Sequence, residues 1–199
     1  MVKASRRSVV LRAMLLGIAA FLSVQSGVAY AADSPKSAFI GDLLGQLDRV
    51  KGQIMALENA VPQDKATWRP AEGVRSISEV YLHIAGSNYF LVSFTGVKPP
   101  ANSRIDEKST TDKAKIADAL KTSFEWTKSE VAKFTDDDLE KKVDFFGQKA
   151  TVRNVLLTLL SHLHEHLGQS IAYARTNGVV PPWTEEQQAA LKKSMEKKK

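Results

Sequence analysis

Apolar residues recur at three- and four-residue steps along most of the chain, and this pattern predicts long amphipathic helices. The first helix is expected over residues 35–61. Two prolines and a glycine interrupt the pattern over residues 62–75, so the next apolar segment is expected to form a separate helix. The stripe of the first helix consists of Phe39, Ile40, Leu43, Leu44, Leu47, Val50, Ile54 and Leu57.

The second predicted helix begins at Ser76, where the sequence Ser-Ile-Ser-Glu has the form of a capping box. It ends before Gly96, and a polar connection leads to a third helix over about residues 111–134. The inner positions expected in this third helix are Ile116, Leu120, Phe124, Trp126 and Val131.

The fourth predicted helix begins after a Thr151 cap and ends at Asn177-Gly178. The segment before it, residues 135–151, is compatible with a small hairpin around Gly147 or with a simple turn. Residues 184–199 predict a short, frayed terminal helix. Four long helices and no clear strand predict an all-α fold, a four-helix bundle with a short C-terminal helix.

The first 31 residues have the features of a signal peptide: a basic start without acids, an apolar run, and the small-x-small sequence Ala29-Tyr30-Ala31. The apolar run is short for a membrane-spanning helix, so we expect cleavage after Ala31 and export to the periplasm or beyond, with no stable membrane anchor. The remaining residues, 32–199, are expected to form one domain. Its folded core is expected at about 36–184, followed by a basic tail.

The charge and the cysteine content of the chain limit which partners and ligands are expected. Removing residues 1–31 removes four basic residues and no acid, which lowers the formal net charge from +6 to about +2. Much of the remaining positive charge lies in the terminal sequence LKKSMEKKK, so no basic face for nucleic acid is expected. The chain has no cysteine, which excludes disulfides and thiolate ligands. Stability must therefore come from an apolar core.

Three of the four histidines, His162, His164 and His166, lie within five consecutive residues of the fourth predicted helix. Residues four apart project from one helix face, so His162 and His166 can bind one ion, whereas His164 is expected at the surface. The remaining histidine, His83, lies midway along the second helix among apolar residues. A lone histidine there is more often a hydrogen-bonded core residue, but facing helices of bundles also build ligand sites in this way.

A site of three neutral imidazoles has distinct chemical consequences. It leaves a divalent ion its full charge and one open coordination position, as in catalytic rather than structural zinc sites. Such an ion acidifies a bound water or thiol and polarises a carbonyl. Apart from such a water, the residues do not identify a catalytic group.

His83 and the later pattern His162-x-x-x-His166-x-Gly168-Gln169 resemble the DinB/YfiT-like family of helical-bundle metalloproteins. The flanking sequences WRPAEGVRSISEVYLHIA and GQSIAYARTNGVVPPW are also similar to that family, and the resemblance covers residues 36–184. It implies that the three histidines, His83, His162 and His166, bind zinc or nickel. It also implies activity as a thiol transferase or a metal-dependent hydrolase. The family often has arginine after the last ligand, and Leu167 stands there in this chain, which leaves the substrate class open.

Several neighbours of the histidines are further candidates. Gln169 lies one turn beyond His166 and is expected either to contact the site or to be a surface amide. Glu79 is expected either to hydrogen-bond the far ring nitrogen of His83 or only to close the capping box. Ser87 and Phe90 share the His83 face and are candidates for a pocket wall. Packing roles are expected for Trp68, Trp126 and Trp183.

We therefore expect an exported metal-dependent enzyme, a hydrolase or group transferase that acts on a small molecule. Export disfavours thiol transfer, because cytosolic thiol cofactors are not expected at high concentration outside the cytoplasm. The alternatives are a non-catalytic bundle that binds a metal or a small ligand, and a structural bundle with packed histidines. A homodimer is left open.

A peptidase is a less favoured alternative. The sequence from His162 to His166 also fits the pattern H-x-x-E-H, in which Glu165 would act as the base. The third ligand would then be a downstream glutamate, but Glu185 and Glu186 lie in the terminal segment, and the histidine of the second helix would have no role.

Overall fold

The computed structural model of the chain describes residues 37–196. The predicted signal peptide, residues 1–31, and the last three lysines of the basic tail lie outside the described residues. Within residues 37–196, no helix is both long enough and apolar enough to cross a membrane.

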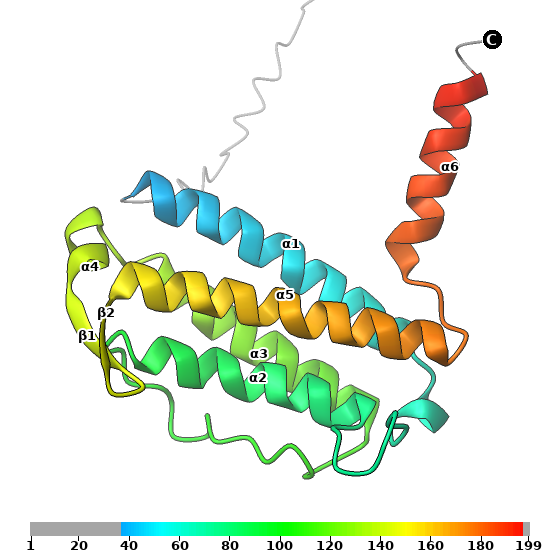
Figure 1. Cartoon of the computed structure of the whole chain (residues 1–199), viewed down its shortest axis with the longest axis horizontal. Coiled ribbons are helices and arrows are strands. Elements are labelled where there is room, and N and C mark those ends of the chain that lie inside the picture. The colour runs from blue at the N-terminus through cyan, green and yellow to red at the C-terminus, as the bar shows by residue number, and fades with distance from the viewer. Residues whose placement is uncertain (1–36, 197–199) are drawn as a thin grey trace, which may run out of the picture. The chain divides into compact units, whose positions relative to one another are not determined.

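Four long helices form a bundle, which confirms the predicted fold class (Figure 1). They are α1 (Ala38–Ala60), α2 (Ile77–Ser93), α3 (Lys113–Val131) and α5 (Val152–Thr176). Side-chain caps define the starts of α2 and α5 where the sequence predicts them. Ser76 and Glu79 form the capping box of α2, and the Thr151 side chain accepts from the backbone N–H of Asn154 at the start of α5.

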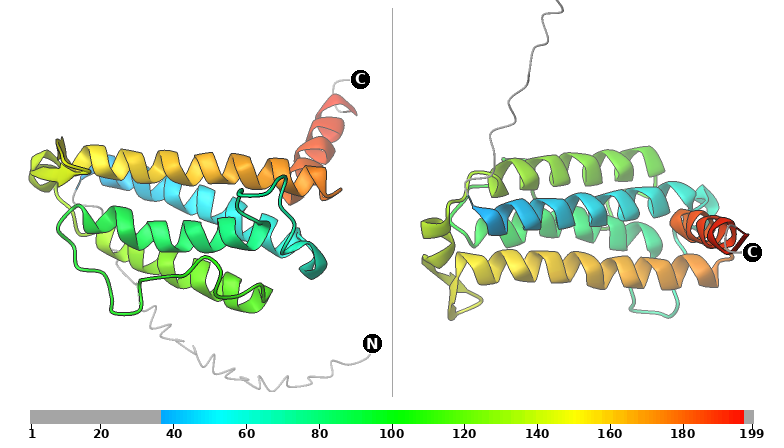
Figure 2. Two further views of the ribbon diagram at one scale, coloured as in Figure 1. Left: turned by 60° about the horizontal axis from the view of Figure 1, so that its bottom comes forward. Right: turned by 90° about the horizontal axis from the view of Figure 1, so that it is seen from above.

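Helix α2 packs against both α3 and α5, and helix α1 packs against the same two helices. Lys113 at the start of α3 donates to backbone carbonyls at the end of α1, so these two helices run in opposite directions. In Figures 1 and 2, α2 runs antiparallel to α5, and the connection over residues 97–112 returns along α2 to the start of α3. The two helices that carry the predicted ligands are therefore direct neighbours.

The ambiguous segment before α5 forms a short helix, α4 (Asp136–Glu140), and a hairpin, which confirms the hairpin alternative. Strands β1 (Lys142–Phe145) and β2 (Gln148–Thr151) are antiparallel. The turn between them places both Phe146 (φ 54°) and Gly147 (φ 78°) in the left-handed region. A single 3-10 turn, η1 (Gln63–Lys65), lies between α1 and α2.

The apolar stripes of the four helices meet in one core. Each stripe follows the three- and four-residue spacing seen in the sequence, so the core lies along the axis of the bundle. All three tryptophans pack against it and are partly buried, as predicted. The largest fully buried side chains include Phe124, Ile40, Leu47, Ile54, Ile84 and Leu156.

Helix α6 (Pro182–Glu196) follows α5 after a turn at Gly178. Trp183 near its start packs against the core, whereas Leu191 and Met195 are exposed. The third helix is shorter than predicted, because it ends at Val131 and the next three residues turn toward α4. Trp126 is only half-buried and lies against Tyr89.

Candidate metal centre

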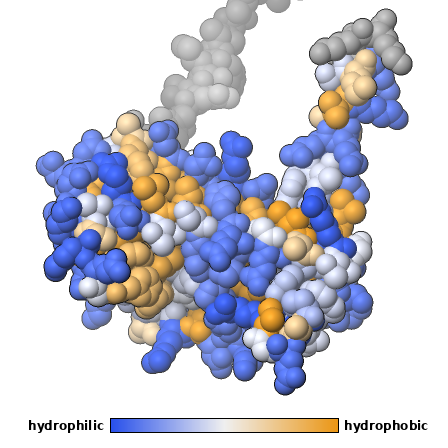
Figure 3. All heavy atoms as spheres, viewed as in Figure 1, coloured by the Kyte–Doolittle hydropathy of each residue, from blue (hydrophilic) through white to orange (hydrophobic). Residues whose placement is uncertain are grey.

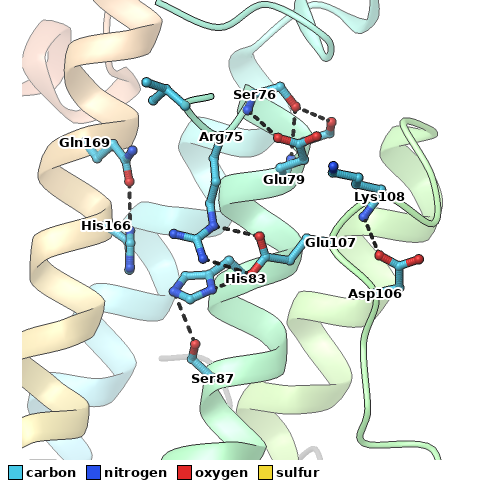
Figure 4. Close-up of polar contacts among 12 residues, drawn as sticks. Arg75, Ser76, Glu79, His83, Ser87, Asp106, Glu107, Lys108, His166 and Gln169 are labelled. Atoms are coloured by element: carbon cyan, nitrogen blue, oxygen red, sulfur yellow. Dashed lines mark hydrogen bonds and ion pairs between the residues drawn. The ribbon is translucent and has the colours of Figure 1, made fainter. Parts of the chain in front are cut away.

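The three histidines predicted as ligands meet between α2 and α5. The Nε2 atom of His162 lies 3.1 Å from that of His83 and 3.1 Å from that of His166. One ring nitrogen from each of the three residues lies within 4.8 Å of the others. In Figure 4, the rings of His83 and His166 approach each other from the two helices.

Local helix geometry produces this convergence. His162 and His166 are one turn apart on α5, so their rings project from one face. His83 lies near the middle of α2, which packs directly against α5. Two nitrogens bound to one tetrahedral zinc ion at ~2.0–2.1 Å are separated by roughly 3.4 Å. The measured spacings are close to that value.

A carboxylate from the connection between α2 and α3 orients His83. Glu107 Oε1 lies 2.7 Å from His83 Nδ1. Arg75, immediately before the α2 cap, donates to Glu107 through Nε at 2.6 Å and Nη2 at 3.1 Å. Figure 4 shows Arg75, Glu107 and His83 joined by these polar contacts. Because an ionised carboxylate only accepts hydrogen bonds, His83 donates from Nδ1 and carries its free lone pair on Nε2.

A second polar chain orients His166. Its Nδ1 lies 2.8 Å from Oε1 of Gln169, and Nε2 of Gln169 donates to the hydroxyl of Tyr173 at 3.0 Å. The amide oxygen therefore accepts from Nδ1 of His166, and the lone pair of this ring also lies on Nε2. Of the two roles left open for Gln169, the contact with the site is the one present.

The proton positions of His83 and His166 indicate whether a cation fits between the three rings. The Nε2 lone pairs of His83 and His166 both point toward the position of His162 Nε2, which lies 3.1 Å from each. A proton on His162 Nε2 can form a linear hydrogen bond to only one of these lone pairs, whereas a cation among the three nitrogens accepts them all. Metal-bound histidines usually donate their other ring N–H to a carboxylate or carbonyl, as His83 and His166 do. The arrangement fits a divalent ion.

Burial keeps the rings of His83 and His162 neutral and available as ligands. It lowers the pKa of His83, while the hydrogen bond with Glu107 opposes this shift. Burial and the neighbouring His166 and His83 rings lower the pKa of His162 to about 4. Burial alone would raise the pKa of Glu107, but the hydrogen bonds from Arg75 and His83 outweigh it, so the pKa is lowered. The carboxylate is therefore ionised at neutral pH.

A cavity of about 560 Å³ adjoins the triad. Of the triad, His83 lines this cavity, together with Ser87 and Glu107, and the cavity lies between α2 and the connection that follows it. Ser87 Oγ is 3.4 Å from His83 Nε2, so this hydroxyl faces both the triad and the cavity. Ser87 and Phe90 therefore form part of the cavity wall, as predicted from their helix face.

Other predicted residues lie away from this centre. His164 is exposed, as predicted, and its Nδ1 pairs with the carbonyl of Leu160. Glu165, the base of the peptidase alternative, is also exposed. Of the two roles left open for Glu79, closing the capping box is the one present, and no hydrogen bond joins this residue to His83. Glu79 instead accepts from the backbone of Ser76 and from Arg69, because the capping box holds its carboxylate at the start of α2.

Sequence analysis missed Glu107, Arg75 and Arg104, which line or support the site. Glu107 and Arg104 belong to a polar connection without regular structure, so no helical or strand spacing relates them to the histidines. Arg75 directly precedes the capping box, which fixes its place at the start of α2. Its place beside the predicted capping box was the only feature of the sequence that could have indicated a role for Arg75.

The family profile of the DinB superfamily matches residues 46–170. Protein YjoA of Bacillus subtilis, described as uncharacterized, is 26% identical over 125 aligned positions, and the match covers 61% of this chain and 80% of YjoA.

Solved structures give the same fold. A DinB-like protein from Bacillus cereus has a TM-score of 0.63 and 24% identity, covering 72% of this chain and 95% of that protein. YfiT from Bacillus subtilis, described as a probable metal-dependent hydrolase with an unusual four-helix bundle topology, has a TM-score of 0.58 and 14% identity. The likeness to YfiT covers 70% of this chain and 88% of YfiT.

Proposed function

The chain belongs to the DinB superfamily, and on this basis we propose that it is a metal-dependent hydrolase of small molecules. The convergence of three histidine Nε2 atoms beside a cavity is the observation that carries the proposal. The name of YfiT, a structural neighbour described as a probable metal-dependent hydrolase, supports the same reaction class.

His83, His162 and His166 would hold the ion. Zinc or nickel is proposed, because imidazole is a suitable ligand for both. When bound, such an ion supplies a Lewis acid that polarises a carbonyl and promotes the ionisation of water. Three protein ligands leave a coordination position open, which is the arrangement of catalytic zinc sites.

The surrounding residues have separate roles in this proposal. Glu107, held by Arg75, fixes the ring of His83, and Gln169 fixes the ring of His166. Ser87 presents a hydroxyl between the triad and the cavity, where it can hydrogen-bond the oxygen of a bound carbonyl group. Hydrolysis adds water across an ester or amide bond: the carbonyl carbon gains the oxygen, and the leaving group gains a proton.

A turnover screen tests the proposal. The full chain, with and without added zinc or nickel, would be assayed on ester, amide and thioester substrates beside His83→Ala. His164→Ala is the matched control, because this histidine is exposed and outside the triad. We expect metal-dependent turnover in the parent and in His164→Ala and its loss in His83→Ala. Negligible turnover in all three on every substrate would overturn the hydrolase assignment and favour a binding module.

A further inference from the structure

We propose that the cavity beside the triad selects substrates with an apolar body and a single carboxylate, and that Arg104 binds the carboxylate. The inference rests on the proposed function, because it takes the triad as the reactive end of the cavity. It concerns the opposite part of the cavity, which the proposed function leaves without a role.

Arg104 provides the charge for this selection. It lines the cavity, and within residues 37–196 it has no ion pair or side-chain hydrogen bond. Glu107 also lines the cavity, but its charge is balanced by Arg75. The cavity wall therefore has one cation without a partner among the described residues. A guanidinium matches a carboxylate in shape, and its one positive charge neutralises the single negative charge of that group, whereas a phosphate dianion would retain a net charge in the cavity.

The path of the connection places Arg104 away from the triad. Glu107 contacts His83, and Ile105 lies over Gly86, one turn further along α2. The chain therefore runs antiparallel to α2 here, and Arg104 precedes the contact at Gly86. Three residues of extended chain span at most ~10 Å, which limits the distance between the Cα atoms of Arg104 and Glu107. A substrate can thus reach the triad with one end and Arg104 with its carboxylate.

Most of the remaining wall is apolar, and Ser93 and Ser103 add two hydroxyls. Leu82, Phe90, Pro99 and Ile105 line the cavity, and the side chain of Phe90 is 53% exposed. Clefts that bind small molecules combine such walls with a few polar groups that fix orientation. An exposed aromatic ring at the margin of the cavity is therefore suited to contact the apolar body of a substrate.

The hairpin extends this apolar wall. Phe146 is 62% exposed, and its ring centre lies 4.8 Å from that of Phe94 and 5.9 Å from that of Phe90. Apolar surface is visible where the hairpin meets the end of α2 (Figure 3). A bulky residue in the left-handed region is strained, and such strain is concentrated at functional sites. The strained turn holds an aromatic ring beside the cavity.

Calorimetric titration of four probes tests the inference. The probes are 4-phenylbutyrate, its neutral amide, butyrate, and phenyl phosphate as a dianion. The full chain would be titrated as purified and again after chelation, because a bound ion would itself attract anions. The variants are Arg104→Gln and Phe90→Ala. Lys98→Gln is the control, because Lys98 is an exposed cation on the same connection outside the cavity wall.

We expect the chelated chain to bind 4-phenylbutyrate roughly tenfold more tightly than its amide. Arg104→Gln should abolish this preference, Lys98→Gln should retain it, and Phe90→Ala should weaken binding of the three probes that carry a phenyl ring. Equal affinity for the acid and the amide, or an unchanged preference in Arg104→Gln, would overturn the inference. Tighter binding of phenyl phosphate than of 4-phenylbutyrate would overturn the assignment to a carboxylate.

The two proposals can fail separately. Binding that depends on Arg104, together with no turnover in the substrate screen, would refute the hydrolase and leave the cavity assignment standing. Metal-dependent turnover that Arg104→Gln leaves unchanged on every acidic substrate would refute the cavity assignment alone.

Discussion

Oε1 of Glu107 lies 2.7 Å from Nδ1 of His83, although 24 positions separate the two residues in the chain. This contact fixes which nitrogen of His83 carries the proton and turns Nε2 toward His162. Glu107, from a connection without regular structure, thus determines which nitrogen of His83 is available to bind a metal ion.

Replacing Glu107 is expected to weaken metal binding. Glu107→Ala should lower zinc affinity about 10- to 100-fold, because the His83 ring loses the partner that orients it. Glu107→Gln retains an acceptor oxygen without the charge and should have a smaller effect. Competition with a chromogenic chelator measures the affinity. Asp106→Asn, an exposed neighbour, is the control, and an unchanged affinity in Glu107→Ala would contradict the proposed role.

Ser87→Ala is expected to lower kcat roughly tenfold on the best substrate of the screen, with little change in KM and full metal content. The reason is that its hydroxyl lies beside His83 Nε2 and faces the cavity. Ser93→Ala is a matched control, since Ser93 also lines the cavity but donates to the Phe90 carbonyl. Equal kcat values for the parent and Ser87→Ala would show that the hydroxyl has no part in the reaction.

The candidate ligands could be found from the sequence because helical spacing is regular. One-turn separation on α5 brings His162 and His166 together, and the apolar neighbours of His83 place it inside the bundle. The same regularity gave the caps at Ser76 and Thr151. These features depend on interactions between residues close in the chain.

The supporting residues could not be found in this way. Glu107 reaches His83 only because the 97–112 connection folds back along α2. For Glu79, the sequence left two roles open, and the capping box at Ser76 holds the carboxylate away from the ring. Arg104 acquires its place in the cavity wall from the same connection. Such contacts depend on tertiary packing.

The buried carboxyl group of Glu58 is expected to make the free energy of unfolding depend on pH. Burial raises its pKa above 4.5, and Lys113 opposes the shift. Below pH 4.5 the folded and unfolded states are both protonated, so burial carries no ionisation cost. As the pH rises, the unfolded state ionises first, and stability falls until the pH passes the folded-state pKa. Glu58→Gln cannot ionise and should be more stable than the parent at pH 7.5 by about 1 kcal/mol.

Chemical denaturation at pH 4 and pH 7.5 measures this difference. The two proteins should have nearly equal free energies of unfolding at pH 4. Glu125→Gln, at an exposed position of α3, should show no comparable gain. A less stable Glu58→Gln at pH 7.5 would mean that attraction to Lys113 outweighs the cost of burial.

The positive φ angle of Phe146 in the hairpin turn suggests a substitution that should stabilise the protein. Phe146→Asn should raise the free energy of unfolding by about 0.5–1 kcal/mol, because asparagine followed by glycine favours a turn with two positive φ angles. Gly147→Ala should lower it by about 1 kcal/mol, since alanine is strained at φ 78°. Thermal unfolding measures both. A lower Tm in Phe146→Asn would show that the contacts of the Phe146 ring outweigh its backbone strain.

The metal content of the purified protein is the most direct measurement. The chain would be produced without a histidine tag, supplied with zinc or nickel, passed through a desalting column and analysed by elemental mass spectrometry, beside His162→Ala and His164→Ala. Circular dichroism would confirm that all three are folded. The parent and His164→Ala should each retain about one ion per chain, and His162→Ala should lose it. A parent far below one ion per chain, or a His162→Ala protein that retains as much as the parent, would contradict the assignment of the triad as a metal centre.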